Sequence, residues 1–359
     1  MVGPPIFTAV STSARQLYLL LRCIAFSPRA EVEITQQGIK FSVEESRAVQ
    51  GSTILEKALF SSYSCRPPNS NDNALPAFSI SITALLETLQ IFGVADTGSS
   101  ARNPYGGFSS SYGNAFSTPA LALSGTCRIS YQEIGAPLTI TIQEGSVTTS
   151  CELNTYEVQQ PYDDGGGIPL DRSKLCLRAI LRSTWLSDAI AELSGTNPNV
   201  LVVNVSNRSA PYFSLEGEGG PFGDTTVDFT PDAKNDATSD GVKGKKQPVV
   251  TETFVVSAPS GTHGRVKQRY KFDMIKKASR AMALATKVSV RQDEQGVLSL
   301  QFMVELGDGT FGPRREETPA TNAPPAQTRN DFVDFRFVPL LNEDDTESEA
   351  QTEDEDFEE

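Results

Sequence analysis

The sequence repeats one order of predicted elements twice, and this duplication restricts the fold more than any other feature. Amphipathic helices are expected to start near residues 13 and 83 in the first half and near 183 and 273 in the second, at spacings of 70 and 90 residues. Each half has the order strand, helix, hairpin, strand, helix, hairpin. A chain of 359 residues is long enough for two domains with ordinary cores. We therefore expect an α+β protein made of two copies of one unit of antiparallel sheet and two helices.

The first half contains the clearest local signals. Ser13 is a suitable N-cap for a helix whose apolar residues recur at helical spacing. These apolar residues are Leu17, Leu20, Leu21 and Ile24. Residues 30–44 alternate between apolar and polar around Gly38, which predicts a hairpin with one buried face. A second helix is predicted from residue 82 to its end at Gly93.

The second half repeats this order with other residues. A strand is predicted over 174–181, a helix over 183–195, and a hairpin from 200–207 and 212–217. Further strands cover 250–257 and 265–272. A helix over 273–286 is predicted to be capped by Asp273. The last predicted hairpin covers 288–306 and turns between Gln292 and Gly296.

Composition divides the chain into ordered parts and insertions. Three segments rich in Gly, Ser, Asp, Lys or Pro are predicted loop insertions, because they bury too little apolar surface to offset chain entropy. They cover residues 96–118, 216–247 and 307–330. We expect a first domain over 1–156, a linker over 157–171 with three consecutive glycines, a second domain over 172–341 and a disordered acidic tail over 342–359.

The formal net charge of −14 comes mostly from that tail. Residues 342–359 contain 11 of the 45 acidic residues and no basic one. The rest of the chain therefore has 34 acidic residues against 31 basic ones. The folded part is close to neutral, so the acidic total does not exclude contact with nucleic acid, which depends on local basic surfaces.

Cysteine and histidine usage argues against several classes of site. The five cysteines form no CxxC pair, as expected of free thiols in a reducing compartment. The one histidine, His263, lies in a predicted turn, so we expect no histidine-rich metal site and no histidine-dependent catalysis. No stretch approaches the roughly 20 apolar residues that cross a bilayer, and no secretory signal is visible.

Two runs of sequence connect this architecture with a known family. The run GIKFSVEESRAVQG, followed by FSISITALLETLQIFG, resembles the DNA sliding-clamp family. Within that family it is most similar to the Rad-one type of subunit of the checkpoint clamp, the nine-one-one complex. The ending FRFVPLLNEDD, a last strand followed by proline and an acidic tail, is a further shared feature. The resemblance covers most of the chain outside the insertions and the tail.

The resemblance implies a fold, a function and partners. It implies a ring whose outer wall is sheet and whose hole is lined by helices, in which this chain joins two paralogous clamp subunits in a heterotrimer. A loader ATPase would place the ring around double-stranded DNA in the nucleus, where it would serve checkpoint kinases and repair factors. We therefore expect a protein that is not an enzyme, with no cofactor, no membrane contact and no reading of base sequence.

A clamp needs cations that face a duplex, because phosphate contacts attract DNA without fixing its position. The basic residues on or beside the predicted helices are the candidates. The predicted DNA-facing residues are Arg15, Arg22, Arg182, Lys276, Lys277, Arg280 and Lys287. The other helices also carry Glu87, Asp188 and Glu192, so the contact is expected to be uneven and weak, and an ordinary solvated helix face remains an alternative.

A second basic feature lies in the predicted strand RVKQRYKF. Arg265, Lys267, Arg269 and Lys271 alternate, so a strand would point all four the same way. Four like charges repel, which favours an acidic neighbour on the next strand or on a partner. The candidate is a docking surface for a loader or for the acidic tail, and a solvated outer strand is an equal alternative.

Two flexible regions carry further candidates. In the family, the segment corresponding to residues 157–171 borders the groove where partner peptides dock, although a plain tether explains its glycines equally well. In the tail, Thr346 and Thr352 are each followed three residues later by an acidic residue. That spacing is typical of acidophilic kinase sites, but it also arises by chance in an acidic tail.

Two other functions remain open at this point. A homotrimeric replication clamp has the same fold and the same role of tethering to DNA. A metal-dependent 3′–5′ exonuclease has been proposed within the family, and Glu31 and Glu33 would share one strand face. That chemistry needs three or four converging carboxylates, and no motif supplies the others. The same two residues also suit the polar side of a hairpin, with Lys40 nearby as a counter-charge.

Overall fold

The computed structural model describes residues 3–67, 74–91, 126–144, 146–158, 167–229, 251–258, 264–306 and 329–341. The predicted segments 96–118 and 342–359, most of 307–330 and most of the linker lie outside these residues. The described chain divides into two compact units. The first contains residues 1–43, 52–163 and 305–333, and the second contains 44–51, 164–304 and 334–359.

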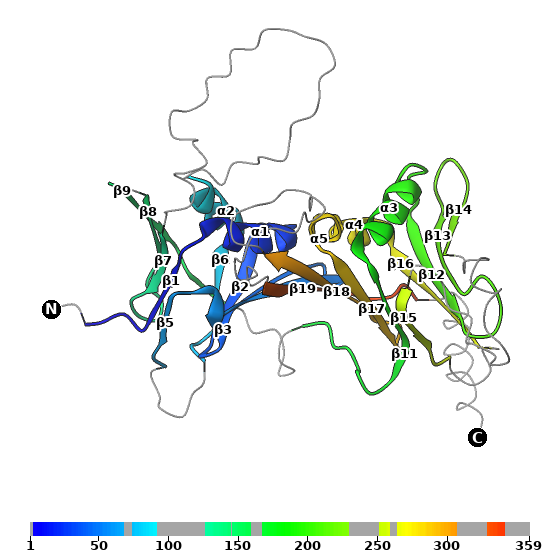
Figure 1. Ribbon diagram of the computed structural model, residues 1–359, viewed down its shortest axis with the longest axis horizontal. Coiled ribbons are helices and arrows are strands. Elements are labelled where there is room, and N and C mark those ends of the chain that lie inside the picture. Colours follow the sequence, from blue (N-terminus) through cyan, green and yellow to red (C-terminus); the bar gives the residue numbers. More distant parts are fainter. Residues whose placement is uncertain are drawn as a thin grey trace, which may run out of the picture. The chain divides into compact units, whose positions relative to one another are not determined.

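Among the described residues, the first repeat contains ten strands and two helices, and Figure 1 labels most of them. Its elements are β1 (Phe7–Ser11), α1 (Ala14–Ile24), β2 (Arg29–Ile34), β3 (Gly38–Glu45), β4 (Val49–Glu56), a short 3-10 turn (Lys57–Leu59), β5 (Ser62–Cys65), β6 (Phe78–Ser81), α2 (Ile82–Gln90), β7 (Thr126–Tyr131), β8 (Leu138–Glu144), β9 (Val147–Leu153) and β10 (Tyr156–Glu157). The helix starts predicted near residues 13 and 83 are confirmed, and the Ser13 side chain accepts a hydrogen bond from the Gln16 N–H. The predicted end at Gly93 lies outside the described residues.

The second repeat follows the same order. Its elements are β11 (Leu175–Arg182), α3 (Ser183–Ser194), β12 (Val200–Ser206), β13 (Phe213–Glu218), β14 (Thr225–Asp228), β15 (Thr251–Val256), β16 (Arg265–Lys271), α4 (Phe272–Lys276), α5 (Ser279–Leu284), β17 (Lys287–Asp293), β18 (Leu298–Leu306) and β19 (Arg329–Phe337). The predicted β12–β13 and β17–β18 hairpins are confirmed.

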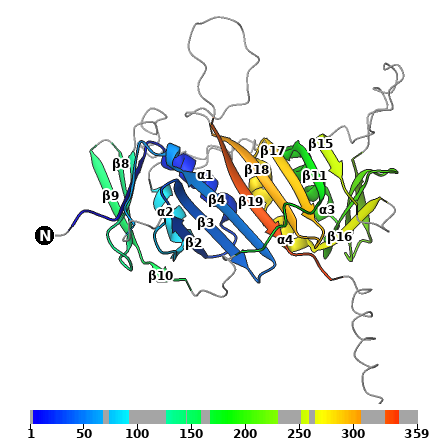
Figure 2. The same cartoon turned by 90° about the horizontal axis from the view of Figure 1, so that it is seen from below.

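The strand orders confirm the duplication and the α+β class. The order β5-β1-β7-β8-β9 in the first repeat corresponds to β15-β11-β17-β18-β19 in the second. Likewise β6-β2-β3-β4 corresponds to β16-β12-β13-β14. Every pairing whose register is known is antiparallel, as in β2–β3 and β12–β13. Strands β2, β3 and β4 of the first repeat and β19, β18 and β17 of the second follow one another in a single ten-stranded sheet, which Figure 2 shows from below.

Apolar helix faces form the core of each unit. The predicted residues Leu17, Leu20, Leu21 and Ile24 of α1 are all buried. α1 packs beside α2, and in the second unit α3 packs beside α5. No helix in the described residues is long and apolar enough to span a membrane. All five cysteines lie in described positions and are free thiols.

Two local predictions were wrong. Residues 216–247 were expected to be a loop insertion, but Glu216–Glu218 completes β13, and β14 covers Thr225–Asp228. The four residues of β14 are too few to show an alternating pattern in sequence. The helix predicted over 273–286 is split into α4 and α5, and it begins at Phe272 with no side-chain cap from Asp273. At the split, Lys277 and Ala278 donate to carbonyls three residues back, which tightens the turn.

Candidate nucleic-acid interface and docking surface

The exposed cations of the fourth predicted helix divide between its two halves. Lys276 ends α4, and its side chain is exposed and has no ion pair within the described residues. Arg280 is exposed in the first turn of α5. The opposite faces of the two helices are buried: Ile275 is buried on α4 and Met282 on α5. These two are the predicted DNA-facing residues that the structure presents most openly.

Two predicted DNA-facing lysines are engaged with carboxylates instead. The Lys277 Nζ lies 2.8 Å from the Glu45 Oε2, and both side chains are partly buried. Lys287 is the first residue of β17 and lies 2.9 Å from Glu252 on β15. A cation with a carboxylate this close offers less net charge to a phosphate, so these two positions are weaker candidates.

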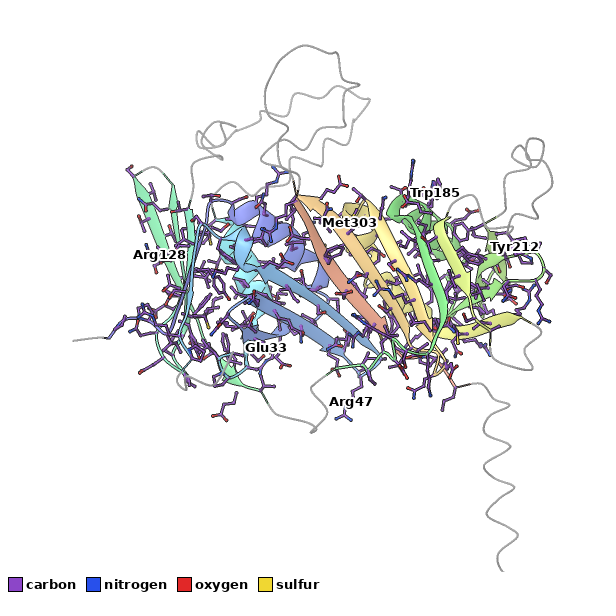
Figure 3. The ribbon with its side chains drawn as sticks, turned by 60° about the horizontal axis from the view of Figure 1, so that its bottom comes forward. Glu33, Arg47, Arg128, Trp185, Tyr212 and Met303 are labelled. Atoms are coloured by element: carbon purple, nitrogen blue, oxygen red, sulfur yellow. The ribbon has the colours of Figure 1, made fainter. Side chains whose placement is uncertain are left out.

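Two of the predicted arginines, Arg22 and Arg182, lie beside aromatic rings. Arg15 and Arg22 are half-buried on α1, and the Arg22 guanidinium carbon lies 5.8 Å from the centre of the Tyr18 ring. Arg182 precedes α3 and lies 5.5 Å from the ring centre of Trp185, which Figure 3 labels. Stacking on an aromatic face holds a guanidinium in place while its edge stays able to donate.

The basic strand β16 has the predicted alternation. Its charged side chains lie on one face, while Tyr270 is buried on the other and its hydroxyl donates to the Gly296 carbonyl at 2.6 Å. Burial raises the pKa of the Tyr270 hydroxyl well above its ordinary value, and the nearby Asp293 carboxylate adds to this rise. Arg265, Lys267, Arg269 and Lys271 form the basic row of β16. The buried tyrosine fixes the face of the strand on which this row lies.

The acidic neighbours expected for the basic row are present in the same sheet. Lys267 Nζ lies 3.1 Å from Glu216 Oε2 and 3.6 Å from Glu218 Oε1. Arg269 Nη2 lies 3.0 Å from Glu218 Oε2. Both carboxylates are on β13, so the ion pairs reach across β12. The sequence did not reveal these pairs, because it predicted a strand only as far as residue 217 and gave no sign that β13 and β16 flank the same strand, β12.

The two ends of the basic row differ from its centre. Arg265 donates to Asn204 Oδ1 at 2.9 Å and to Ser209 Oγ at 3.3 Å. Lys271 is exposed and has no ion pair within the described residues. Along the strand edge, the Leu340 N–H donates to the Arg269 carbonyl at 2.8 Å. The segment that precedes the acidic tail therefore runs along β16.

Hydrogen bonds hold one end of the linker, and a cation–π contact lies beside the other. The Ile168 N–H donates to Gln50 Oε1 at 3.1 Å, and the Ile168 carbonyl accepts from Arg336 Nη1 at 2.6 Å. At the other end, the Arg29 guanidinium lies 4.6 Å from the centre of the Tyr156 ring. The middle of the linker, and with it the predicted docking role, lies outside the described residues, as do Thr346 and Thr352.

The carboxylates of the exonuclease alternative lie on β2. Glu33, labelled in Figure 3, pairs with Lys40 at 3.6 Å, as the hairpin interpretation expected. No group of three or more His, Cys, Asp or Glu that could hold a metal ion occurs among the described residues.

Comparison with known proteins agrees with this architecture. The family model described as "Repair protein Rad1/Rec1/Rad17" matches residues 6–304. The chain belongs to the Rad1/Rec1/Rad17 family of repair proteins. The predicted recognition, the sliding-clamp fold and the function of a checkpoint-clamp subunit are thereby confirmed.

The similar proteins carry checkpoint names. The DNA damage checkpoint control protein rad1 of Schizosaccharomyces pombe is 27% identical over 335 residues, covering 93% of this chain and 86% of that protein. The Cell cycle checkpoint protein RAD1 of Homo sapiens is 27% identical over 297 residues, covering 83% and 85%. The DNA repair protein Rad1 of Drosophila melanogaster is 22% identical over 331 residues, covering 90% of each chain.

Proposed function

We propose that this chain is a non-catalytic subunit of a heterotrimeric DNA-damage checkpoint clamp, assembled with two paralogous clamp subunits around double-stranded DNA. Membership of the Rad1/Rec1/Rad17 family supports a role in the nucleus and work alongside paralogous subunits. A loader ATPase would open the ring, and checkpoint and repair proteins would bind it once it is closed.

The observation that carries this proposal is the difference between two equivalent strands. In the first unit, β4 has a neighbour in β19, and the Thr53 hydroxyl donates to the Phe332 carbonyl at 3.0 Å. The equivalent of β4 in the second repeat is β14, and the equivalent of β19 in the first repeat is β9. Both β14 and β9 are at the edge of their sheets.

Within the described residues, β9 and β14 therefore each have an edge with no neighbouring strand, where the equivalent strands β19 and β4 are neighbours. Antiparallel edges with free N–H and C=O groups pair readily with another chain. If β14 of one subunit pairs with a β9-type strand of the next, the pattern of β4 with β19 continues between chains. Rings arise when such head-to-tail contacts close.

Contact with DNA would come from the helices rather than from β16. Lys276 and Arg280 are exposed, whereas the charges of Lys267 and Arg269 are matched by two glutamates. Two exposed cations in one subunit would give a weak contact that does not depend on base sequence, which is compatible with sliding.

The test is the composition of the native complex. The tagged chain is purified from nuclease-treated extract of its own organism, and the intact assembly is weighed by native mass spectrometry. One copy with two different clamp-like chains is the expected result. Three copies of this chain would instead support a homotrimeric clamp, which the complementary edges β9 and β14 of a single chain also allow. A chain that is recovered alone would contradict the ring.

A further inference from the structure

The turn between β13 and β14 holds an exposed aromatic residue at its tip. Phe222 is 76% exposed, and among the large apolar side chains of the described residues only Leu341 is more exposed. A fixed, exposed aromatic ring is typical of protein interfaces, where such residues contribute much of the binding energy. Phe222 lies outside both the basic helix residues and the edge strands β9 and β14.

Glycines and hydrogen bonds shape the turn around Phe222. Gly219 and Gly223 have positive φ angles of 75° and 86°, which favour glycine. The Gly219 N–H donates to Asp224 Oδ1 at 3.2 Å, and the Gly219 carbonyl accepts from Asn199 Nδ2 at 2.6 Å. At Gly220 a Cβ would lie 2.6 Å from the Thr196 carbonyl oxygen, so the turn lies directly against the segment that follows α3. These contacts define the shape of the turn, with Phe222 exposed at its tip.

The equivalent turn in the first repeat shows what such a turn contacts. It joins β3 to β4, and residues 44–51 belong to the second compact unit rather than to the first. Its Glu45 pairs with Lys277 at the end of α4, and its Ala48 carbonyl accepts from the Val338 N–H just after β19 at 3.0 Å. Ser46 and Arg47 at its tip also have positive φ, and Figure 3 labels Arg47. This turn therefore packs against the end of α4 and the residue that follows β19, all within the second compact unit.

We infer that the β13–β14 turn makes the corresponding contact with a neighbouring clamp subunit, with Phe222 as its apolar anchor. This inference rests on the proposed ring. The described part of this chain leaves Phe222 exposed, so the helix end and strand end that receive the turn would belong to a partner. The first turn is anchored by a charged residue, Glu45. The second carries an aromatic ring, so the partner presents an apolar pocket at the place that corresponds to Lys277.

The test uses the heterotrimer assembled from the full chain and its two paralogous clamp chains. Replacing Phe222 with the photoreactive residue p-benzoylphenylalanine should give, after irradiation, a covalent adduct with one of the two paralogues. The matched control places the same residue at Ile134, a 55% exposed apolar residue of the β7–β8 connection, and should give no such adduct.

A second variant measures the strength of the contact. Phe222→Ala should weaken the trimer at least about tenfold in a dilution series followed by native mass spectrometry, as expected for an interface hot spot. Ile134→Ala should leave dissociation unchanged. If Phe222→Ala dissociates as the wild type does and position 222 gives no adduct, the inference is wrong while the ring stands. If the wild-type chain does not assemble with its paralogues at all, the proposed function fails, and this inference fails with it.

Discussion

The two repeats share one strand order but differ at their outer strands. In the first repeat, β4 has eight residues, and Thr53 and Leu55 are buried beside a neighbouring strand. In the second repeat, β14 has four residues, and Thr226 and Asp228 are exposed. Short edges with a charged residue resist uncontrolled pairing. The difference teaches that a duplicated fold can pair one set of outer strands, β4 and β19, within the chain. The equivalent strands, β14 and β9, are left for a partner.

The largest effect is expected at β14. The Phe229 N–H donates to the Phe213 carbonyl, so alternate residues of the strand point their N–H groups toward β13 and Thr226 points outward. Thr226→Pro removes only the outward N–H and should abolish stable assembly with one paralogue while the chain stays folded. Native mass spectrometry and thermal unfolding check both parts.

Thr226→Ala is the matched control, because it keeps the backbone N–H and removes the side chain. It should assemble as the wild type does. Equal assembly of the proline and alanine variants would show that β14 is not a pairing edge, and the two repeats would then differ only in strand length.

The basic residues of α4 and α5 should contribute more to DNA retention than those of β16. Lys276→Ala with Arg280→Ala removes two exposed charges, so the slope of log affinity against log salt should fall by about 2 and DNA retention at low salt about tenfold. Lys267→Ala with Arg269→Ala removes two charges that glutamates already match, and it should change retention little. The half-life of the loaded clamp on end-blocked DNA, measured across a salt series, checks both pairs.

The reverse result would be informative. Loss of retention with the β16 pair alone would mean that the basic row faces DNA despite its glutamates. Unchanged retention with the helical pair would remove Lys276 and Arg280 from the DNA-facing set.

A smaller difference is expected between the ion pairs of β13 and of β2 in what they contribute to the free energy of unfolding. Glu218 is 23% exposed and touches both Lys267 and Arg269, so Glu218→Gln should lower the free energy of unfolding by about 1 kcal/mol. Glu33 in the first repeat is 43% exposed and pairs only loosely with Lys40, so Glu33→Gln should change it by about 0.5 kcal/mol at most. Urea unfolding of the two variants at pH 7 makes the comparison. An equal loss in both would mean that the ion pairs across β12 are no stronger than an ordinary surface pair.

Long periodic segments were predictable from the sequence, while short elements and paired charges were not. The stripe from Leu17 to Ile24 predicts α1 because burial of one helix face requires that spacing. β14 and the break at Ala278 have no such signal, since four residues carry no period and the break depends on packing around a fully buried alanine. The alternation in β16 predicted the basic face, but Glu216 and Glu218 come near it only through the order β13-β12-β16.

The smallest expected effect concerns two aspartates of β19 that fall in different units. Asp331 lies in the first unit, and its carboxylate oxygens are buried without a hydrogen-bond partner among the described residues. Its side chain is 1% exposed, and burial raises the pKa of Asp331 above its ordinary 3.8, although Arg329 at 3.5 Å opposes this. Asp334 lies in the second unit, where burial also raises its pKa but Arg336 and Arg291 oppose it.

The sign of the pH effect follows from the raised pKa of Asp331. Because the folded state binds the proton more tightly than the unfolded state, stability falls as pH rises from 3.8 through the folded-state pKa, and the loss is complete above it. Asp331→Asn should therefore be more stable than wild type at pH 7, by about 0.5–1 kcal/mol, and the difference should vanish below pH 3.8. Arg329 keeps Glu56 at 2.9 Å as a partner, so the variant leaves no isolated cation. Urea unfolding from pH 3 to pH 7 tests this, and a variant less stable than wild type at pH 7 would mean that the Arg329 pair outweighs burial of the carboxylate.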